Sequence, residues 1–215
     1  WDNLPLQLTH LDCSWNQLSA LSALPETLEH LNCRSNWLDH FVLPDLPASL
    51  LHLDCSSNSS LRALPPLPAR LTHLNCSECS LASLPPLPGT LKTLHYSKNR
   101  LTTLPAPLPN GLKTLNCSRN NIRCLPDLPR TLTGLNCSWQ RDPGMDELPT
   151  LHGTALVNLE CQANRLRMLP DLPESLRVVD CAYNELTVLP ALPKTLVYLD
   201  CSSNLLTARL PDLPD

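Results

Sequence analysis

A motif of about twenty residues repeats along the chain and constrains its fold more than any other feature. Ten units align on the pattern L-x-x-L-x-C-x-x-N, and successive units begin 20 to 24 residues apart. The full unit continues through a return arm that reads L-x-x-L-P-x-L-P. One such unit is too small to bury its own leucines, so the units are expected to stack into a solenoid. The units begin at Leu8, Leu28, Leu50, Leu71, Leu91, Leu112, Leu132, Leu156, Leu176 and Leu196.

Each unit predicts one short strand and one extended arm. The second Leu and the Cys alternate with polar residues, so they share one face of a strand. The arm cannot be α-helical, because each Pro lacks an N–H group and biases the residue before it toward extended conformations. The Asn after the strand has an amide that can bond to turn backbone groups of its own and adjacent coils. The predicted ladder comprises Asn16, Asn36, Asn58, Asn99, Asn120, Asn164, Asn184 and Asn204.

Together the units predict one domain over residues 1–215. Its fold is a leucine-rich-repeat horseshoe, by convention in the α/β class, with short parallel strands on the concave side. The convex arms are extended or polyproline-II-like, with almost no helix. The seventh unit adds four residues and carries Gln140 in the Asn position, which predicts a protruding convex loop near residues 141–147. Neither end has a capping module, so we expect a fragment of a longer protein.

Nine of the eleven cysteines occupy one position of the repeat, and Tyr96 takes that position in the fifth unit. A free Cys behaves as a small buried hydrophobe, which predicts a column of reduced thiols inside the solenoid. Disulfides within it are disfavoured, because in-register side chains point the same way. The alternative is a metal or catalytic thiol, but Cys76-x-x-Cys79 is the only closely spaced pair. The column comprises Cys13, Cys33, Cys55, Cys76, Cys117, Cys137, Cys161, Cys181 and Cys201.

The polar strand positions should line the concave face, where solenoids bind their partners. Exposed-type aromatic residues among them are of the class that anchors interfaces, although the two tryptophans could instead pack over neighbouring coils. We expect no cofactor and no metal. The candidate partner-binding residues are His10, Asp12, Trp15, His30, Asn32, Arg34, His52, Asp54, His73, Asn75, His95, Lys98, Asn116, Arg119, Trp139, Tyr183 and Tyr198.

Four histidines recur at the same strand position, at residues 10, 30, 52 and 73. Histidines on adjacent strands lie within reach of a shared metal ion, so a metal site is one interpretation. The other interpretation is a polar file of weakly titratable side chains. Duplication of a repeat copies the same residue into each unit without any selection for ligand binding.

Charge is segregated along the chain, although the net charge is only −4. Residues 1–60 have a net charge of −6, residues 61–141 of +8, and residues 142–215 of −6. A basic band between acidic ends would steer a partner with an acidic patch. Nucleic acid is not expected as a partner, because no basic-aromatic stacking motif occurs. No apolar run approaches the roughly 18 residues of a membrane span.

The L-P-x-L-P arms, as in LPDLPRTL, LPDLPESL and LPALPKTL, resemble those of bacterial type III secreted effectors of the IpaH/SspH/SlrP and YopM group. In this chain Cys stands where that family usually has an aliphatic residue. The resemblance implies a module that binds a host protein after secretion into the host cell, which is a reducing environment. In the ligase members, a C-terminal ubiquitin-ligase domain follows the repeats, so such a domain in cis is implied outside these residues.

The sequence therefore predicts a non-enzymatic protein-recognition module, serving as the substrate-recognition domain of an effector ubiquitin ligase. Two alternatives stay open. One is a stand-alone scaffold effector without ligase activity, and the other is a thiol- or metal-handling protein that uses the Cys and His files.

Overall fold

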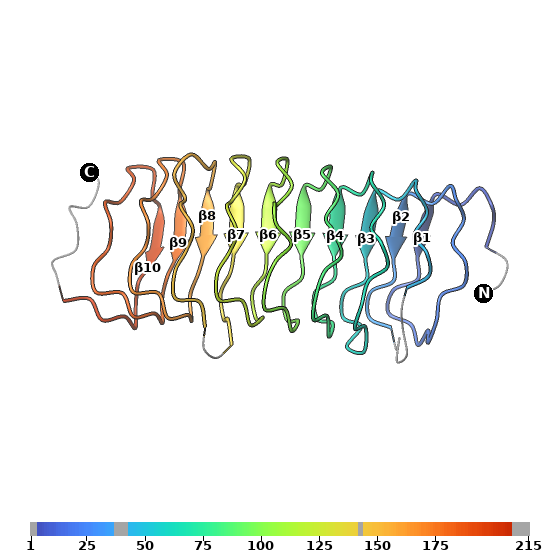
Figure 1. Cartoon of the computed structure of the whole chain (residues 1–215), viewed down its shortest axis with the longest axis horizontal. Helices are drawn as coiled ribbons and strands as arrows, with labels where there is room; N and C mark the ends of the chain where they lie inside the picture. The colour runs from blue at the N-terminus through green and yellow to red at the C-terminus, as the bar shows by residue number, and fades with distance from the viewer. Residues whose placement is uncertain (1–3, 37–42, 142–143, 208–215) are drawn as a thin grey trace.

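The protein is a row of ten stacked coils, each contributing one three-residue strand to a single parallel sheet (Figure 1). The computed structural model describes residues 4–36, 43–141 and 144–207. The predicted leucine-rich-repeat solenoid is confirmed. The strands are β1 (His10–Asp12), β2 (His30–Asn32), β3 (His52–Asp54), β4 (His73–Asn75), β5 (Thr93–His95), β6 (Thr114–Asn116), β7 (Gly134–Asn136), β8 (Asn158–Glu160), β9 (Val178–Asp180) and β10 (Tyr198–Asp200).

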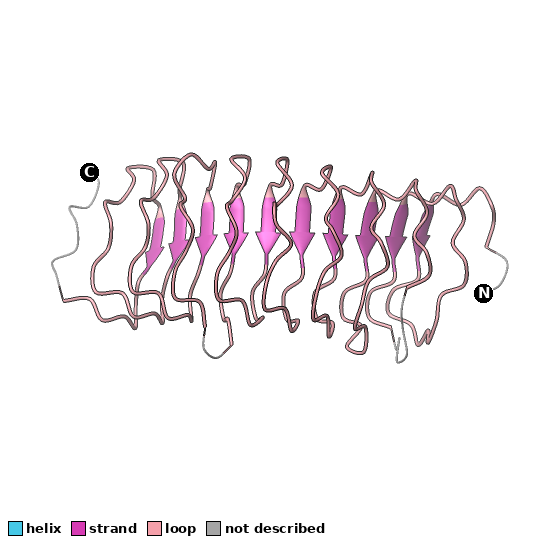
Figure 2. Ribbon diagram, in the orientation of Figure 1, coloured by secondary structure: helices cyan, strands magenta, loops and turns pink. Residues whose placement is uncertain are grey.

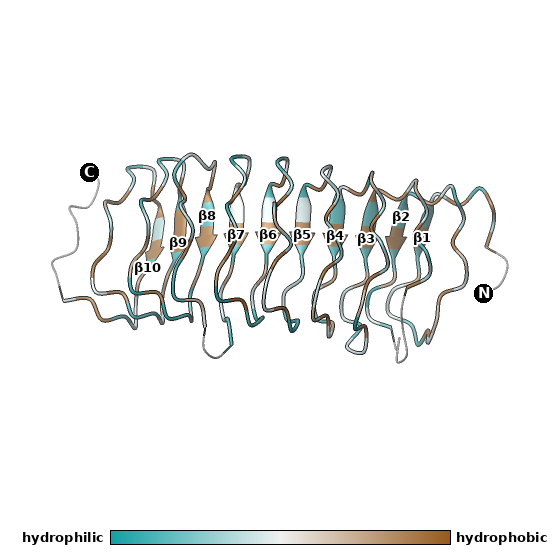
Figure 3. Cartoon of the chain, in the orientation of Figure 1, coloured by the Kyte–Doolittle hydropathy of each residue, from teal (hydrophilic) through white to brown (hydrophobic). Residues whose placement is uncertain are grey.

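The strands pair in chain order and in identical register, so equivalent residues of adjacent coils lie side by side. His10 pairs with His30, for example, and Leu115 pairs with Leu135. In most strands the central residue is buried and its two neighbours are partly exposed. Hydrophobic and hydrophilic residues therefore alternate along each coil (Figure 3). The leucines and cysteines form one continuous core along the solenoid.

The return arms are extended and contain no helix within the described residues (Figure 2). No described segment is a helix that could span a membrane. The second Pro of the arm has a role that the sequence pattern did not reveal. Its carbonyl accepts a hydrogen bond from the Leu that begins the next unit, as between Pro68 and Leu71 at 3.0 Å. Each arm thus ends in a tight turn that leads into the next strand.

Threonine side chains in these turns tie consecutive coils together. The Thr27 hydroxyl donates to the carbonyls of Leu6 and Leu8 in the preceding coil. Thr90, Thr131 and Thr195 make the same pair of bonds. The recurring T-L dipeptide before the strand was the available signal for these bonds, and the sequence interpretation did not use it.

The inserted residues of the seventh coil only partly leave the body of the solenoid. The predicted loop near residues 141–147 includes 142–143, which lie outside the described residues. Asp146 and Glu147 are exposed. Met145, the residue directly before them, is fully buried in the core. The insertion therefore returns to the core through one apolar side chain.

The ladder asparagines bond adjacent coils to each other. The Asn36 amide donates to the carbonyls of Cys33 in its own coil and Cys13 in the preceding coil, both at 3.0 Å, and its oxygen accepts from the Leu18 backbone N–H. Gln140 takes the same position and makes equivalent bonds to Cys117 and Cys137. Each of these amides satisfies buried backbone groups that would otherwise lack partners.

Cys79 occupies the Asn position of the fourth coil, and its thiol donates two long hydrogen bonds, of 3.5 Å each, to the Cys55 and Ser77 carbonyls. We expect Cys79→Asn to raise the free energy of unfolding by about 1 kcal/mol, because an amide donates stronger hydrogen bonds than a thiol. Urea denaturation followed by circular dichroism measures this change. Cys79→Ser, which is too short to reach both coils, should show no gain. A less stable Cys79→Asn variant would contradict the prediction.

One residue in each coil adopts a left-handed backbone conformation, which the sequence did not predict. The ten residues directly before the ladder position have φ between 53° and 57°. None of them is glycine or asparagine, the types that favour this region. We call this set the rim, because each member follows the carboxyl end of its strand. It comprises Trp15, Ser35, Ser57, Glu78, Lys98, Arg119, Trp139, Ala163, Tyr183 and Ser203.

Ala163 tests the energetic cost of this conformation, since its φ is 55° and it carries no functional side chain. We expect Ala163→Gly to stabilise the protein by about 0.5–1 kcal/mol, because relief of left-handed strain exceeds the added entropy of the unfolded chain. Ala155→Gly, at an exposed position outside the positive-φ set, should instead destabilise it by about the same amount. Thermal melting of the two variants should show opposite shifts. A loss of stability in Ala163→Gly would refute the argument.

Candidate functional site

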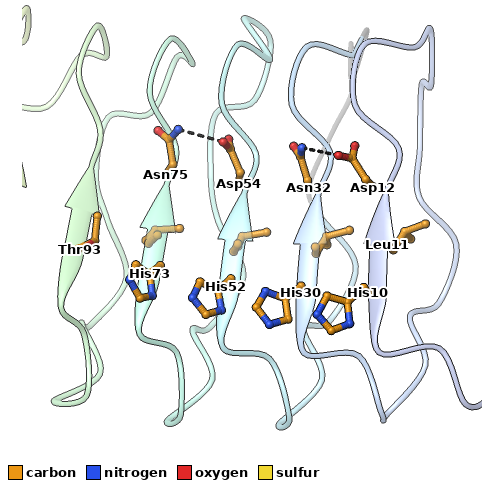
Figure 4. Close-up of a pocket in the computed structure, with 13 residues that line it drawn as sticks. His10, Leu11, Asp12, His30, Asn32, His52, Asp54, His73, Asn75 and Thr93 are labelled. Carbon is orange, nitrogen blue, oxygen red and sulfur yellow. Dashed lines mark hydrogen bonds between the residues drawn. The ribbon is translucent and has the colours of Figure 1, made fainter.

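The exposed face of the sheet carries two parallel files of polar side chains over the first four strands (Figure 4). We call His10, His30, His52 and His73 the His column, and Asp12, Asn32, Asp54 and Asn75 the amide file. A groove of about 390 Å³ lies along them and extends to Thr93. We refer to this surface as the concave face, and the in-register strands bring these sequence-predicted residues together on it.

The four imidazoles of the His column stack face to face. Successive ring centroids are 4.2 Å apart, and the ring planes differ by 10° to 15°. This spacing is shorter than the roughly 4.8 Å between adjacent strands. The hydroxyls of Thr9 and Thr72 lie 2.9 Å from the Nδ1 atoms of His10 and His73. The sequence predicted the file but not the stacking.

Burial and nearby positive charge favour the neutral forms of His52 and His73. Desolvation, followed by the charges of His73, His30 and His10, lowers the pKa of His52. Desolvation and the nearby Lys92 lower the pKa of His73. His95, which follows the amide file in β5, also has a lowered pKa, because desolvation outweighs the opposing effect of Asp54. These rings are therefore neutral at pH 7 and become charged only in more acidic solution.

The amide file contains two separate Asn–Asp hydrogen-bonded pairs, which fix its two carboxylates. The Asn32 amide donates to Asp12 Oδ2 at 3.0 Å, and the Asn75 amide donates to Asp54 Oδ2 at 3.1 Å. The other carboxylate oxygen of each Asp accepts from the backbone N–H and hydroxyl of the Ser two residues later, as in the 2.6 Å bond from Ser14 to Asp12. The bonds from Ser14 and Asn32 lower the pKa of Asp12.

The stacked geometry does not favour the metal interpretation of the histidines. Nitrogen lone pairs lie in the plane of an imidazole ring, so nearly parallel rings direct them side by side and not toward a common point. No group of three His, Cys, Asp or Glu side chains within the described ranges is arranged to hold a metal ion.

The file continues beyond the groove into the middle of the sheet. Asn116 lines a second, smaller depression of about 180 Å³ with Asn136 and Glu160. The Asn136 amide donates to Glu160 Oε2 at 2.6 Å, and burial raises the pKa of Glu160. Glu160 was absent from the sequence-based candidates, although it occupies the same repeat position as Asp12 and Asp54.

Several predicted binding residues lie on the rim and not on the strand face. Trp15, Lys98, Arg119, Trp139 and Tyr183 all follow the strands, three residues beyond their carboxyl ends. The sequence interpretation placed them on the concave surface itself. They are nevertheless exposed, with Trp15 at 74% and Tyr183 at 62%.

Aromatic and charged residues on the rim or directly before it contact each other across neighbouring coils. The Arg34 guanidinium lies 5.5 Å from the Trp15 ring centroid, and that of Arg119 lies 5.0 Å from the Trp139 ring centroid. Lys98 pairs with Glu78 at 2.9 Å. Both tryptophans thus cover a neighbouring arginine while leaving ring surface exposed. Tyr198 differs, because it lies in β10 at the His-column position and is 51% exposed.

The cysteines are free in the structure, and burial controls their reactivity. Eight of the nine column thiols are buried, while Cys201 in the last coil is partly exposed. Desolvation raises the pKa of Cys117 to about 12 and that of Cys55 well above its ordinary value. Cys124 lies on a return arm and is exposed. The thiolate form that attacks an electrophile is therefore suppressed throughout the buried column.

A thiol-labelling experiment at pH 8 distinguishes these environments. We expect an aromatic disulfide reagent to modify Cys124 within minutes, Cys201 more slowly, and the buried thiols only after urea is added. The Cys124→Ser variant should lose the fast phase. A fast phase that survives this substitution would reveal a reactive thiol in the column and revive the catalytic interpretation.

The chain matches no protein-family model and no curated protein sequence. Solved structures do match it. YopM from Yersinia enterocolitica WA-314 aligns with 100% of the chain at 38% identity and a TM-score of 0.80. A Shigella effector LRR domain aligns with 82% of the chain and 70% of its own length, at 28% identity and a TM-score of 0.62. The chain is a leucine-rich-repeat domain similar in structure to those of bacterial effectors.

This leucine-rich-repeat domain spans 50% of the length of the Y. enterocolitica YopM chain. It also resembles the functional domain of InlJ from Listeria monocytogenes, whose structure is described as including a cysteine ladder. That alignment has 26% identity and a TM-score of 0.66, and it covers 95% of this chain and 41% of InlJ. A column of stacked cysteines is thus shared with another solved repeat structure.

Proposed function

We propose that this domain recognises a host protein on its concave face and rim. The observation that carries the proposal is the in-register sheet, whose polar files lie open over ten strands. Copies of one strand position form a surface that is continuous, rigid and wide enough for a protein partner. Exposed aromatics at Trp15, Trp139 and Tyr183 supply the residue class that anchors interfaces.

The middle of the rim suits a partner with an acidic patch. Lys98 and Arg119 project from adjacent coils within the segment of net charge +8. Such a band accelerates encounter with an acidic surface. We therefore place the first contact with the host protein at these two coils.

A capture experiment tests this role. Immobilised wild-type domain is compared with Lys98→Glu/Arg119→Glu and with Arg62→Glu/Arg130→Glu, which reverses two exposed charges outside the rim. We expect the rim variant to lose at least one host protein that the control variant retains at 150 mM salt. Equal capture by both variants would remove the rim from the proposal.

We further propose that the domain selects substrates for an effector ubiquitin ligase whose catalytic domain lies in cis, in the manner of the family it resembles. In the full-length protein, Lys98→Glu/Arg119→Glu should abolish ubiquitination of the captured host protein and leave autoubiquitination intact. A full-length protein that captures its partner without ubiquitinating it would instead be a scaffold effector. Secretion into the host cell fits the free thiols, since host cytoplasm keeps cysteines reduced.

A further inference from the structure

The groove over β1–β4 differs in charge from the basic middle of the molecule. Among the side chains that line it, only Asp12 and Asp54 carry a formal charge while the histidines are neutral. Both belong to the first 60 residues, where acids outnumber bases by seven to one. The groove therefore complements a positively charged occupant, in contrast to the acidic partner expected at Lys98 and Arg119.

The two carboxylates are held in position to accept further hydrogen bonds. Each has one oxygen occupied by a Ser and the other bonded once by an Asn. A carboxylate oxygen can accept two bonds, so Oδ2 of each Asp keeps a free acceptor site. A Lys or Arg side chain could bond there without breaking the existing network. Charge-assisted bonds of this kind are roughly twice as strong as neutral ones.

We propose that this groove binds a basic, extended segment of a partner protein, and that protonation of the His column releases it. Asp12 and Asp54 are two strands apart, which corresponds to roughly 10 Å. In a polyproline-II segment, residues i and i+3 lie on the same side about 9 Å apart. The spacing thus matches a segment with Lys or Arg at every third position. This inference rests on the proposed role of the concave face in protein recognition.

Acid should weaken the negative charge of the groove. The charged or titratable groups around the His column are Asp12, Asp54, His95, Lys92 and Glu29. At pH 7.5 the carboxylates dominate. In more acidic solution, protonation of stacked imidazoles adds positive charge that offsets the two carboxylates of the groove. Because the rings are only 4.2 Å apart, each added charge also repels its neighbours, which opposes stacking.

Fluorescence anisotropy with labelled synthetic peptides tests the binding. The probes are RPPRPPR and EPPEPPE, with a single-stranded dT10 oligonucleotide as a third. At pH 7.5 and 50 mM salt we expect the Arg peptide to bind at least tenfold more tightly than the Glu peptide. Asp12→Asn/Asp54→Asn should weaken binding of the Arg peptide at least tenfold. Asp127→Asn/Asp171→Asn, which removes the same charge from the convex arms, should not.

A second pair of substitutions tests the pH dependence of binding. For the wild-type domain we expect affinity for the Arg peptide to fall at least tenfold between pH 7.5 and 5.5. His30→Asn/His52→Asn should bind at pH 7.5 and lose most of this pH dependence, since Asn158 shows that the repeat accepts Asn at this strand position. His152→Asn, which alters an exposed His of a return arm, should retain it. Circular dichroism at both pH values confirms that each variant is folded.

Three results would overturn the inference. They are a failure of the Arg peptide to bind at pH 7.5, tighter binding of the Glu peptide or of dT10 at that pH, and an unchanged pH dependence in His30→Asn/His52→Asn. If the Arg peptide fails while capture still depends on Lys98 and Arg119, the groove inference fails and the proposed function stands. If capture also becomes insensitive to the rim, both fail.

Discussion

Asn120→Ala is expected to destabilise the protein by about 3–4 kcal/mol. The Asn120 side chain is fully buried and bonds to three carbonyls, including those of Tyr96 and Cys117, while its oxygen accepts from the Leu101 N–H. Alanine leaves these buried backbone groups without partners, and each unsatisfied group costs about 1–3 kcal/mol. Urea denaturation monitored by circular dichroism measures the loss.

Two further variants separate the ladder bonds from simple side-chain loss. Asn120→Gln should recover much of the stability, because Gln140 makes the equivalent bonds in the next coil. Asn110→Ala, at an exposed turn, should change stability by no more than about 0.5 kcal/mol. If Asn120→Ala were as mild as Asn110→Ala, the ladder would not be a major source of stability.

Tyr96→Cys is expected to destabilise the protein by about 3 kcal/mol, even though it restores the residue found in the other nine coils. Tyr96 is completely buried among the column residues. Its replacement by a much smaller side chain leaves a cavity that the stacked backbone on either side cannot close, because hydrogen bonds fix the coil spacing. A consensus argument would predict the opposite sign.

Two control variants accompany Tyr96→Cys: one keeps the aromatic ring, and the other makes a smaller truncation in the adjacent coil. Tyr96→Phe should stay within about 1 kcal/mol of the wild type, since it preserves the packed volume. Cys117→Ala, a smaller truncation in the adjacent coil, should cost about 1 kcal/mol. Thermal melting ranks all three variants. A stabilised Tyr96→Cys protein would show that the coils relax around the missing ring.

The sequence predicted those parts of the fold that depend on alternation and on proline. The Leu and Cys positions specified the strand and its buried face, and the arm prolines excluded helix. The left-handed rim could not be predicted, because residues as different as Trp15, Lys98 and Ala163 occupy it and none is a favoured type. That conformation is imposed by stacking between coils and not by local preference.

The candidate site was predicted in composition but not in geometry. The histidines and carboxylates were assigned to one face from their repeat positions. The stacking of His30 on His52 and the bond between Asn32 and Asp12 depend on rotamers that only the inter-strand distance determines. Trp139 and Arg119 were assigned to the concave surface because the strand was taken to continue past Cys, whereas it ends before it.

The uniform backbone of the rim has a consequence for how such proteins diversify. Ten side chains ranging from alanine to tryptophan share one conformation to within a few degrees. A new residue at any of these positions therefore alters surface chemistry without moving the main chain. Binding specificity in this architecture can change one coil at a time, through point mutations at evenly spaced sites. The leucine core and the ladder asparagines stay constant.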